Sequence, residues 1–176
     1  QDTLVVIDPV LGDDGELYDT MDMGMVKQMA GLIREADIIT PNVTECKLLL
    51  GLPADTKLYA EQLCHLLPLL GKMGPDAVVV TGVHRRDGGR CVCCYEKEND
   101  QCQFVEYTEL PVDYPGTGDI FAAVMIGGLL QGRELLQSVR LATDFICHAV
   151  ADAIVAGEPV RNGVQLEKNL FRLLPE

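Results

Sequence analysis

Positive charge is scarce in this sequence. Of its 176 residues, 14 are Lys or Arg and 27 are Asp or Glu, which gives a net charge of −13 with histidine neutral. A protein that binds nucleic acid needs Lys and Arg to neutralise the phosphate backbone, so this composition argues against such a partner. The same deficit disfavours an anionic membrane surface. ATP remains possible, because metal ions and backbone amides can neutralise its phosphates.

Long apolar runs, repeats, linkers and low-complexity segments are also absent. No run approaches the ~18 apolar residues that a membrane helix needs, and the start of the chain does not resemble a signal peptide. Hydrophobic residues make up 48% and charged residues 23%, as in ordinary globular proteins. We therefore expect one domain over residues 1–176, with a sizeable core, no membrane partner and a cytoplasmic location.

The seven cysteines form no obvious disulfide framework, because their number is odd. The simplest interpretation is free thiols in a reducing cytoplasm. Cys91 and Cys94 have Cys-x-x-Cys spacing, with Cys102 and His84 nearby, which leaves a zinc site as an alternative. That ligand set is incomplete, since a strand would place Cys91 and Cys94 on opposite faces and no second Cys-x-x-Cys occurs.

Short apolar runs alternate with amphipathic segments along the chain. Continuous apolar runs predict strands at residues 4–7, 36–40 and 77–81. Helical spacing predicts helices at residues 21–34, 44–50, 59–70, from the Gly-Thr-Gly-Asp turn to about 130, about 134–155 and 164–173. We expect Asp19 or Thr20 to cap the first helix and Gly51 to end the second. Such alternation predicts an α/β fold with a mostly parallel sheet.

Two further features concern the edges of that sheet. We interpret Arg86-Asp87-Gly88-Gly89 as a turn signal between two strand-like runs, residues 91–95 and 102–107, which we expect to be antiparallel edge strands. The chain also opens directly on a buried-strand pattern, although a parallel core strand normally follows other elements. We therefore expect the sheet to lack its N-terminal strands.

Polar residues follow directly on three predicted strands. They are Asp8, the group Thr40-Pro41-Asn42, and Thr81-Gly82. Ligands in α/β folds sit at the carboxyl ends of the strands. The sequence thus predicts a polar site at this edge of the sheet.

The segment Gly116-Thr117-Gly118-Asp119 runs into an apolar helix rich in small residues. The N-terminus of a helix presents unpaired N–H groups and attracts anions. Asp119 is poorly placed to bind phosphate there, but well placed to accept a proton from an attacking hydroxyl. We predict a phosphoryl-transfer site with Asp119 as the base; an ordinary loop with an Asp helix cap is the alternative.

Two acidic groups add candidate metal ligands. Asp8 and Asp13 lie five residues apart around a turn, an arrangement that suits Mg²⁺ near phosphates, although a solvated acidic loop is the simpler interpretation. Glu45 follows Asn42 by three residues. It could orient metal-bound water or phosphate, or it could form a capping box with Asn42.

Taken together, these motifs resemble those of the pyridoxal kinases, which belong to the ribokinase-like superfamily. The ordered motifs are Asp8-Pro-Val-Leu-Gly-Asp13, Thr40-Pro-Asn-x-x-Glu45, the strand end Val-Val-Val-Thr81-Gly82, and Gly116-Thr-Gly-Asp119. The resemblance spans nearly the whole chain and implies a three-layer α/β/α fold. Hydroxymethylpyrimidine kinases of the same superfamily are less similar in the first motif.

The resemblance implies ATP-dependent phosphorylation of the 5'-hydroxymethyl group of pyridoxal, pyridoxine or pyridoxamine, with Mg²⁺ and a monovalent cation such as K⁺, by a homodimer. Asp119 matches the catalytic base, and Gly116, Thr117 and Gly118 match the anion hole. Asp13, Thr40 and Glu45 match the phosphate–metal network. The positions that match nucleotide contacts are Asp8, Asn42, Glu45, Thr81, Gly82, Leu110, Pro111, Val112, Thr117 and Gly118.

Members of this family are longer, and their N-terminal segment carries most contacts to the pyridoxal ring and part of the dimer interface. The resemblance covers only the C-terminal, nucleotide-binding part. Two alternatives therefore stay open: a kinase of another small alcohol such as hydroxymethylpyrimidine, and a nucleotide-binding fragment without turnover.

Overall fold

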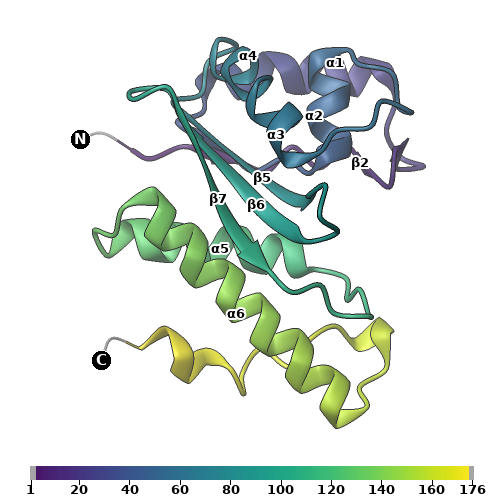
Figure 1. The fold of residues 1–176 in the computed structure, drawn as a ribbon, viewed down its shortest axis with the longest axis vertical. Helices are drawn as coiled ribbons and strands as arrows, with labels where there is room; N and C mark the ends of the chain where they lie inside the picture. Colours follow the sequence, from purple (N-terminus) through teal and green to yellow (C-terminus); the bar gives the residue numbers. More distant parts are fainter. Residues whose placement is uncertain (1–2, 175–176) are drawn as a thin grey trace. The chain divides into compact units, whose positions relative to one another are not determined.

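The computed structural model describes residues 3–174 (Figure 1). Contacts between Cα atoms divide the chain into two compact units, one up to Phe104 and the other from Val105 onward. Among the described residues, the first unit contains most of the sheet and four α-helices, and the second contains two long helices.

Within residues 3–174, the main sheet has five strands in the order β1 (Val6–Ile7), β4 (Ile38–Ile39), β5 (Ala77–His84), β6 (Arg90–Glu96) and β7 (Gln101–Tyr107). β1, β4 and β5 are parallel, with Val6 opposite Ile38 and Ile38 opposite Ala77. β6 runs antiparallel to β5. Parallel strands followed by antiparallel ones confirm the α/β fold that the sequence predicts.

The turn at Arg86–Gly89 joins β5 to β6. Our prediction that it lies between the runs at residues 91–95 and 102–107 was therefore wrong. Gly89 N donates to Asp87 Oδ1 at 3.0 Å, and Gly88 has φ of +89°. The error arose because Gly82 suggested that β5 ends at Thr81. Instead β5 continues through an irregularity between Val80 and Val83 and then pairs again with β6.

Two helices of the first unit lie close to their predicted positions. α1 (Met23–Leu32) begins after Asp22, whose Oδ1 accepts from Met25 N at 2.9 Å, so the expected cap at Asp19 or Thr20 was wrong. α2 (Val43–Leu50) ends at Gly51, which has φ of +66°, as predicted. Glycine suits this left-handed position because it has no side chain to clash.

The predicted helix at residues 59–70 is two short helices, α3 (Ala60–Cys64) and α4 (Leu67–Gly71). Pro68 has no backbone N–H to donate to the preceding turn, and it sits in the first turn of α4. Leu63, Leu67 and Leu70 are nevertheless fully buried. The apolar periodicity therefore predicted the buried face correctly, although it could not predict the break.

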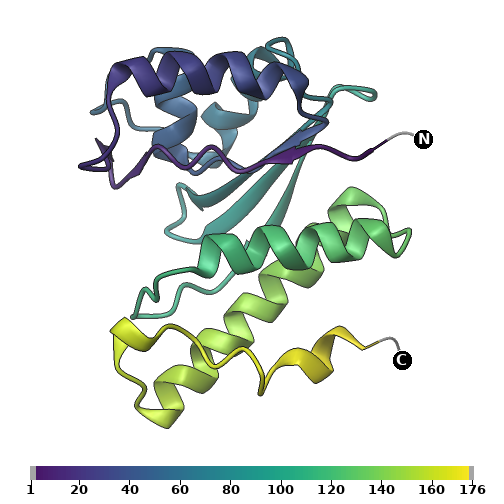
Figure 2. The same cartoon turned by 180° about the vertical axis from the view of Figure 1, so that it is seen from behind.

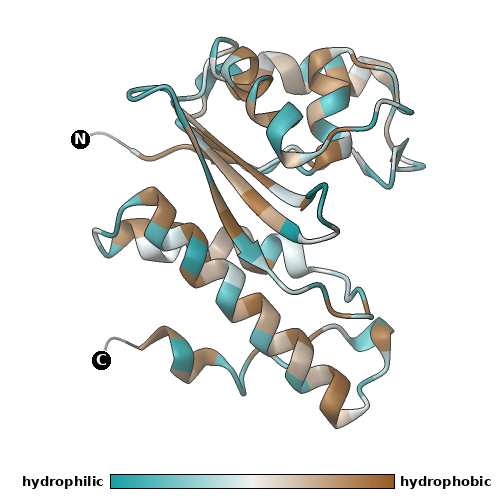
Figure 3. Ribbon diagram, viewed as in Figure 1, coloured by the Kyte–Doolittle hydropathy of each residue, from teal (hydrophilic) through white to brown (hydrophobic). Residues whose placement is uncertain are grey.

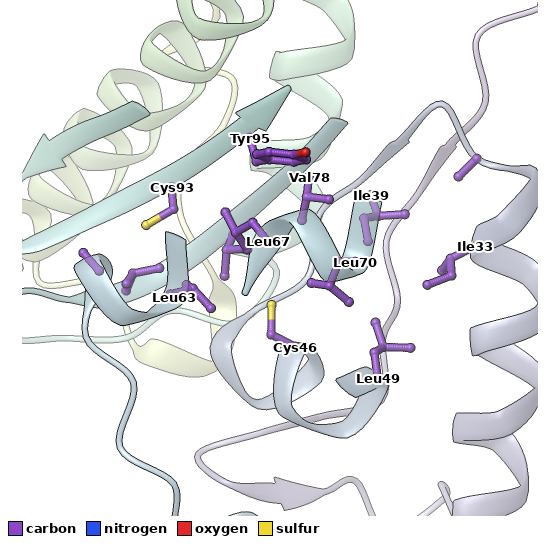
Figure 4. Close-up of a cluster of buried hydrophobic side chains, with 14 of the residues drawn as sticks. Ile33, Ile39, Cys46, Leu49, Leu63, Leu67, Leu70, Val78, Cys93 and Tyr95 are labelled. Carbon is purple, nitrogen blue, oxygen red and sulfur yellow. The ribbon is translucent and has the colours of Figure 1, made fainter. Parts of the chain in front are cut away.

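The core of the first unit lies between its helices and the sheet. In both views of the ribbon, helices α1 to α4 lie on one side of β5 and β6 (Figures 1 and 2). The middle of these strands is strongly hydrophobic, whereas the turns at their ends are hydrophilic (Figure 3). Figure 4 shows the result, with side chains from the helices and strands meeting in one cluster that includes Ile39, Leu49, Leu63, Leu67, Leu70 and Val78.

The second unit is built on α5 (Thr117–Leu130) and α6 (Leu135–Ala156), which pack against each other. A Cβ at Gly128 would lie 2.7 Å from Ser138 Oγ, so glycine permits this close approach. The last predicted helix, residues 164–173, was wrong except for a short 3₁₀ turn, η3 (Leu170–Leu173). None of the helices in residues 3–174 is both long enough and apolar enough to span a bilayer.

Candidate functional site

The carboxyl ends of β1 and β4 bring Asp8 and Thr40 together. The two strands are parallel neighbours, so the residues that follow them lie side by side. Thr40 Oγ1 donates to Asp8 Oδ1 at 2.9 Å, and Thr40 is 5% exposed. This contact confirms that polar groups after separate strands converge at one edge of the sheet.

Asn42 and Glu45 form a capping box at the start of α2. Glu45 N donates to Asn42 Oδ1 at 2.9 Å, and Asn42 N donates to Glu45 Oε2 at 2.8 Å. Glu45 Oε1 also accepts from Leu11 N at 3.0 Å. Glu45 therefore has a structural role in joining the loop after β1 to the start of α2.

Burial makes Glu45 electrostatically unusual. Glu45 is only 4% exposed to solvent. Loss of hydration disfavours the charged form and raises the pKa of Glu45 to about 7; the amides of Asn42 and Leu11 oppose this shift, and nearby Asp8 adds to it. Ionisable groups with shifted pKa values are common at functional sites, so the shift adds to the case for this edge.

A small hairpin covers this edge. Its strands are β2 (Gly12–Asp13) and β3 (Glu16–Leu17), and the turn has positive φ at Asp14 (50°) and Gly15 (87°), as an Asp-Gly turn favours. Asn42 Nδ2 donates to Gly12 O at 2.8 Å, and Gly15 N donates to Thr44 Oγ1 at 2.9 Å. Our sequence reasoning treated this segment as a loop and missed Thr44, a buried hydroxyl in the first turn of α2.

We expect Gly12→Ala to destabilise the protein by about 1–3 kcal/mol, because an added Cβ would overlap the carbonyl oxygen of Glu16 and lie 2.8 Å from Leu17 Cα. The free energy of unfolding, measured in urea, checks this. Gly31→Ala is a matched control: its Cβ would meet no atom within 4 Å, and its helical position favours alanine by roughly 0.5–1 kcal/mol. Equal effects of the two substitutions would contradict the prediction.

Thr81 and Gly82 lie beside the capping box. Asn42 and Thr81 form a parallel bridge, and Thr81 N donates to Pro41 O at 3.1 Å. Gly82 is exposed with φ of +68°, and its carbonyl accepts from Arg90 Nη1 at 3.1 Å. The structure thus joins Asp8, Thr40, Asn42, Glu45 and Thr81 along one edge of the first unit.

The possible metal ligands at this edge do not form a ready-made protein cage. Within residues 3–174, no group of three or more His, Cys, Asp and Glu side chains is arranged to hold a metal ion. Both oxygens of Glu45 already accept backbone N–H groups, and exposed Asp13 accepts from Asp14 N. A metal here would need further oxygen ligands from a bound phosphate or water.

In the second unit, the Gly-Thr-Gly-Asp turn is the N-terminus of α5. Gly116 is the cap with φ of +83°, and Ile120 N makes the first hydrogen bond of the helix to Gly116 O at 3.1 Å. Thr117 Oγ1 donates to Tyr114 O at 3.2 Å. The first N–H groups of a helix have no partner within the helix, and Asp119 is exposed beside them. A Cβ at Gly118 would meet no atom within 4 Å, so the turn is open to a ligand.

The segment before this turn is packed within the second unit. Leu110 and Val112 contact a buried cluster that includes Tyr114, Val150 and Ala153, while Pro111 is exposed. Tyr114 OH donates to Glu158 O at 3.2 Å. These contacts hold the chain that leads into Gly116.

The cysteines differ from our expectation in one respect. Cys64 and Cys102 form a disulfide, so the prediction that all seven are free was wrong. The pairing also takes Cys102 away from the zinc cluster considered with Cys91 and Cys94. The two cysteines are 38 residues apart, and only the fold brings α3 and β7 together, so local residue patterns do not reveal the pairing.

Comparison with known proteins agrees with this geometry. Residues 1–163 match the model of the phosphomethylpyrimidine kinase family. The chain is 31% identical to human pyridoxal kinase, with 95% of this chain and 59% of that protein covered, and 31% identical to a pyridoxal kinase from Rubrobacter xylanophilus, with 81% and 49% covered. It spans about half the length of such curated relatives.

Solved structures agree over almost the whole chain. A pyridoxal kinase from Lactobacillus plantarum has 36% identity and a TM-score of 0.87, covering 98% of this chain and 61% of that one. A candidate phosphomethylpyrimidine kinase from Bacteroides thetaiotaomicron, solved with pyridoxal, has 40% identity and a TM-score of 0.92, covering 99% and 62%. The chain therefore belongs to the phosphomethylpyrimidine kinase family, and its fold is that of the pyridoxal kinases.

Proposed function

We propose that this chain is the nucleotide-binding and catalytic part of an ATP-dependent kinase that phosphorylates the 5'-hydroxymethyl group of pyridoxal, pyridoxine or pyridoxamine. The observation that carries the proposal is the match to the Bacteroides structure solved with pyridoxal, at 40% identity over 99% of this chain. The relatives named pyridoxal kinases support the same substrate class.

The N-terminus of α5 supplies the chemistry in this proposal. Asp119 accepts the proton of the substrate hydroxyl while the oxygen of that hydroxyl attacks the γ-phosphorus of ATP. ADP leaves with the electrons of the broken P–O bond. The backbone amides at Gly116, Thr117 and Gly118 stabilise the negative charge on the transferred group. Phosphoryl transfer depends mainly on such positioning and charge stabilisation. The exposed turn and its left-handed cap support these roles.

In the first unit, we assign nucleotide contacts to Asp8, Asn42, Glu45, Thr81 and Gly82, and in the second to residues 110–112. The support for the first unit is local. Asp8 lies at the end of β1, the bridge between Asn42 and Thr81 holds the start of α2 against β5, and Gly82 is exposed next to Thr81. The nucleotide-binding role of these residues is inferred from their resemblance to the matching positions of the pyridoxal kinases.

Magnesium fits the donor set at this edge. Asp8, Asp13, Thr40 and Glu45 offer only oxygen atoms, which Mg²⁺ prefers, and Mg²⁺ commonly keeps several waters and takes its other ligands from phosphates. Because Glu45 is already bonded through both oxygens, we assign it to orienting water on the ion. When bound, Mg²⁺ would neutralise phosphate charge. A monovalent cation such as K⁺, a homodimeric assembly and a cytoplasmic location complete the proposal by family resemblance.

A second candidate substrate is hydroxymethylpyrimidine. The matching family is described by phosphomethylpyrimidine kinase, and a Staphylococcus aureus hydroxymethylpyrimidine/phosphomethylpyrimidine kinase is 29% identical over 82% of this chain. Both substrates carry a primary alcohol on a heteroaromatic ring, so the same base and anion hole would serve either.

A substrate panel on the full-length protein would separate these candidates. We expect phosphorylation of pyridoxal, pyridoxine or pyridoxamine with Mg·ATP to exceed that of hydroxymethylpyrimidine at least tenfold in kcat/KM, measured by mass spectrometry of the products. Calorimetry with Mg·ATP on residues 1–176 tests nucleotide binding separately. Preferred phosphorylation of hydroxymethylpyrimidine would favour the second candidate, and nucleotide binding without any turnover would contradict both.

A further inference from the structure

The pair Cys64 and Cys102 stands apart from the proposed kinase chemistry. Cys64 is the last residue of α3, and Cys102 lies near the start of β7 at the edge of the main sheet. Their Cα atoms are 5.8 Å apart, within the range that a disulfide favours, and both residues are partly exposed. A small oxidant or reductant in solvent can therefore reach this pair.

The other cysteines of the first unit are not placed for such chemistry. Cys46, Cys91, Cys93 and Cys94 are buried, and Cys46 and Cys93 point into the core (Figure 4). Cys91 Sγ and Cys93 Sγ are 3.9 Å apart and both residues are fully buried. Burial raises the pKa of the Cys94 thiol to about 12 and also raises that of Cys46, so these groups form little of the reactive thiolate.

A covalent bond between Cys64 and Cys102 would restrain a short helix that also contacts the end of β5. α3 is only one and a half turns long, and its N-cap Tyr59 forms a parallel bridge with His84 at the end of β5. Arg86 lies over the Tyr59 ring, 5.5 Å from its centre. Fixing the end of α3 to β7 would thus restrain the contact between Tyr59 and His84.

We propose that Cys64 and Cys102 are a reversible oxidation site whose disulfide clamps α3 to the edge of the sheet. With a small-molecule disulfide such as oxidised glutathione as oxidant, one cysteine thiolate attacks it and releases one thiolate. The second cysteine thiolate then attacks the mixed disulfide and releases the other. The two protein thiols lose two electrons and two protons, and the small disulfide becomes two thiols.

The test uses residues 1–176, reduced fully and then treated with oxidised glutathione. We expect the mass of the protein to fall by that of two hydrogen atoms. Cys64 and Cys102 should become resistant to an alkylating reagent together, and the melting temperature should rise by roughly 5–10 °C. Hydrogen exchange in residues 59–66 should slow at least threefold, while exchange in α6 should not change. Dithiothreitol should reverse each effect.

Two variants keep the proposal open to refutation. Cys64→Ser with Cys102→Ser should remove every response to the oxidant, whereas Cys147→Ser, at a half-buried cysteine of α6, should leave the response unchanged. Stable glutathione adducts on Cys64 or Cys102, a disulfide between two molecules, or unchanged melting and exchange after oxidation would each overturn it.

Discussion

Asp119→Asn should lower kcat for pyridoxal phosphorylation by about 10²–10⁴-fold in the full-length protein, because positioned general bases contribute factors of this size. The amide keeps the shape of the side chain but cannot accept the proton of the substrate hydroxyl. Asp119 is exposed in the first turn of α5, so the substitution removes no buried contact. We expect the dissociation constant for Mg·ATP to change by less than about threefold, since the base acts on the alcohol.

The control is Asp152→Asn, an exposed carboxylate on α6 outside the proposed machinery. It should leave kcat within about twofold of the unmodified protein, which shows that loss of one negative charge is not itself harmful. Steady-state kinetics and calorimetry on both variants give the comparison. If Asp119→Asn retained normal turnover, the role of Asp119 as base would be wrong.

The second large effect concerns Glu45 and pH. Its folded-state pKa is raised to about 7, mainly by burial. The folded protein therefore binds this proton more tightly than the unfolded chain, whose glutamate pKa is about 4.3. The resulting stability is fully present below the unfolded pKa and is lost as pH rises through about 7. Between pH 5 and 8 the loss should be roughly 2–3 kcal/mol.

Glu45→Gln removes this titration while keeping an oxygen that can accept a backbone N–H. The unmodified protein should thus lose roughly 2–3 kcal/mol more than the variant between pH 5 and 8. Urea unfolding in metal-free buffer at both pH values measures the difference. Glu16→Gln, at an exposed position in β3, should follow the unmodified protein. A Glu45→Gln protein with unchanged pH dependence would contradict the inferred burial effect.

The sequence predicted which polar residues meet at one edge of the sheet better than it predicted the connections around them. Asp8, Thr40 and Asn42 follow apolar strands as expected, whereas Thr81 lies within β5; the parallel pairing of β1, β4 and β5 brings these residues to one edge. Strand burial and strand ends are local signals, so they can be read without a structure. The start of α5 at Thr117 was predictable for the same reason, because glycine and small residues mark the turn.

What the sequence could not resolve depends on contacts between distant segments. Glu45 was open to a capping or a metal role, and the structure shows the capping box together with a bond from Leu11 N, 34 residues earlier. The attachment of the small hairpin to Thr44 and the disulfide of Cys64 with Cys102 are likewise products of folding. Neither has a signature in local residue periodicity.

Transfer of the labelled γ-phosphate of ATP to pyridoxal is the measurement that tests the central claim most directly. The full-length protein, incubated with Mg²⁺, pyridoxal and ATP that carries ³²P at the γ-position, should yield labelled pyridoxal 5'-phosphate, and Asp119→Asn should abolish most of that label. Labelled inorganic phosphate alone, or a labelled product that is independent of Asp119, would contradict it.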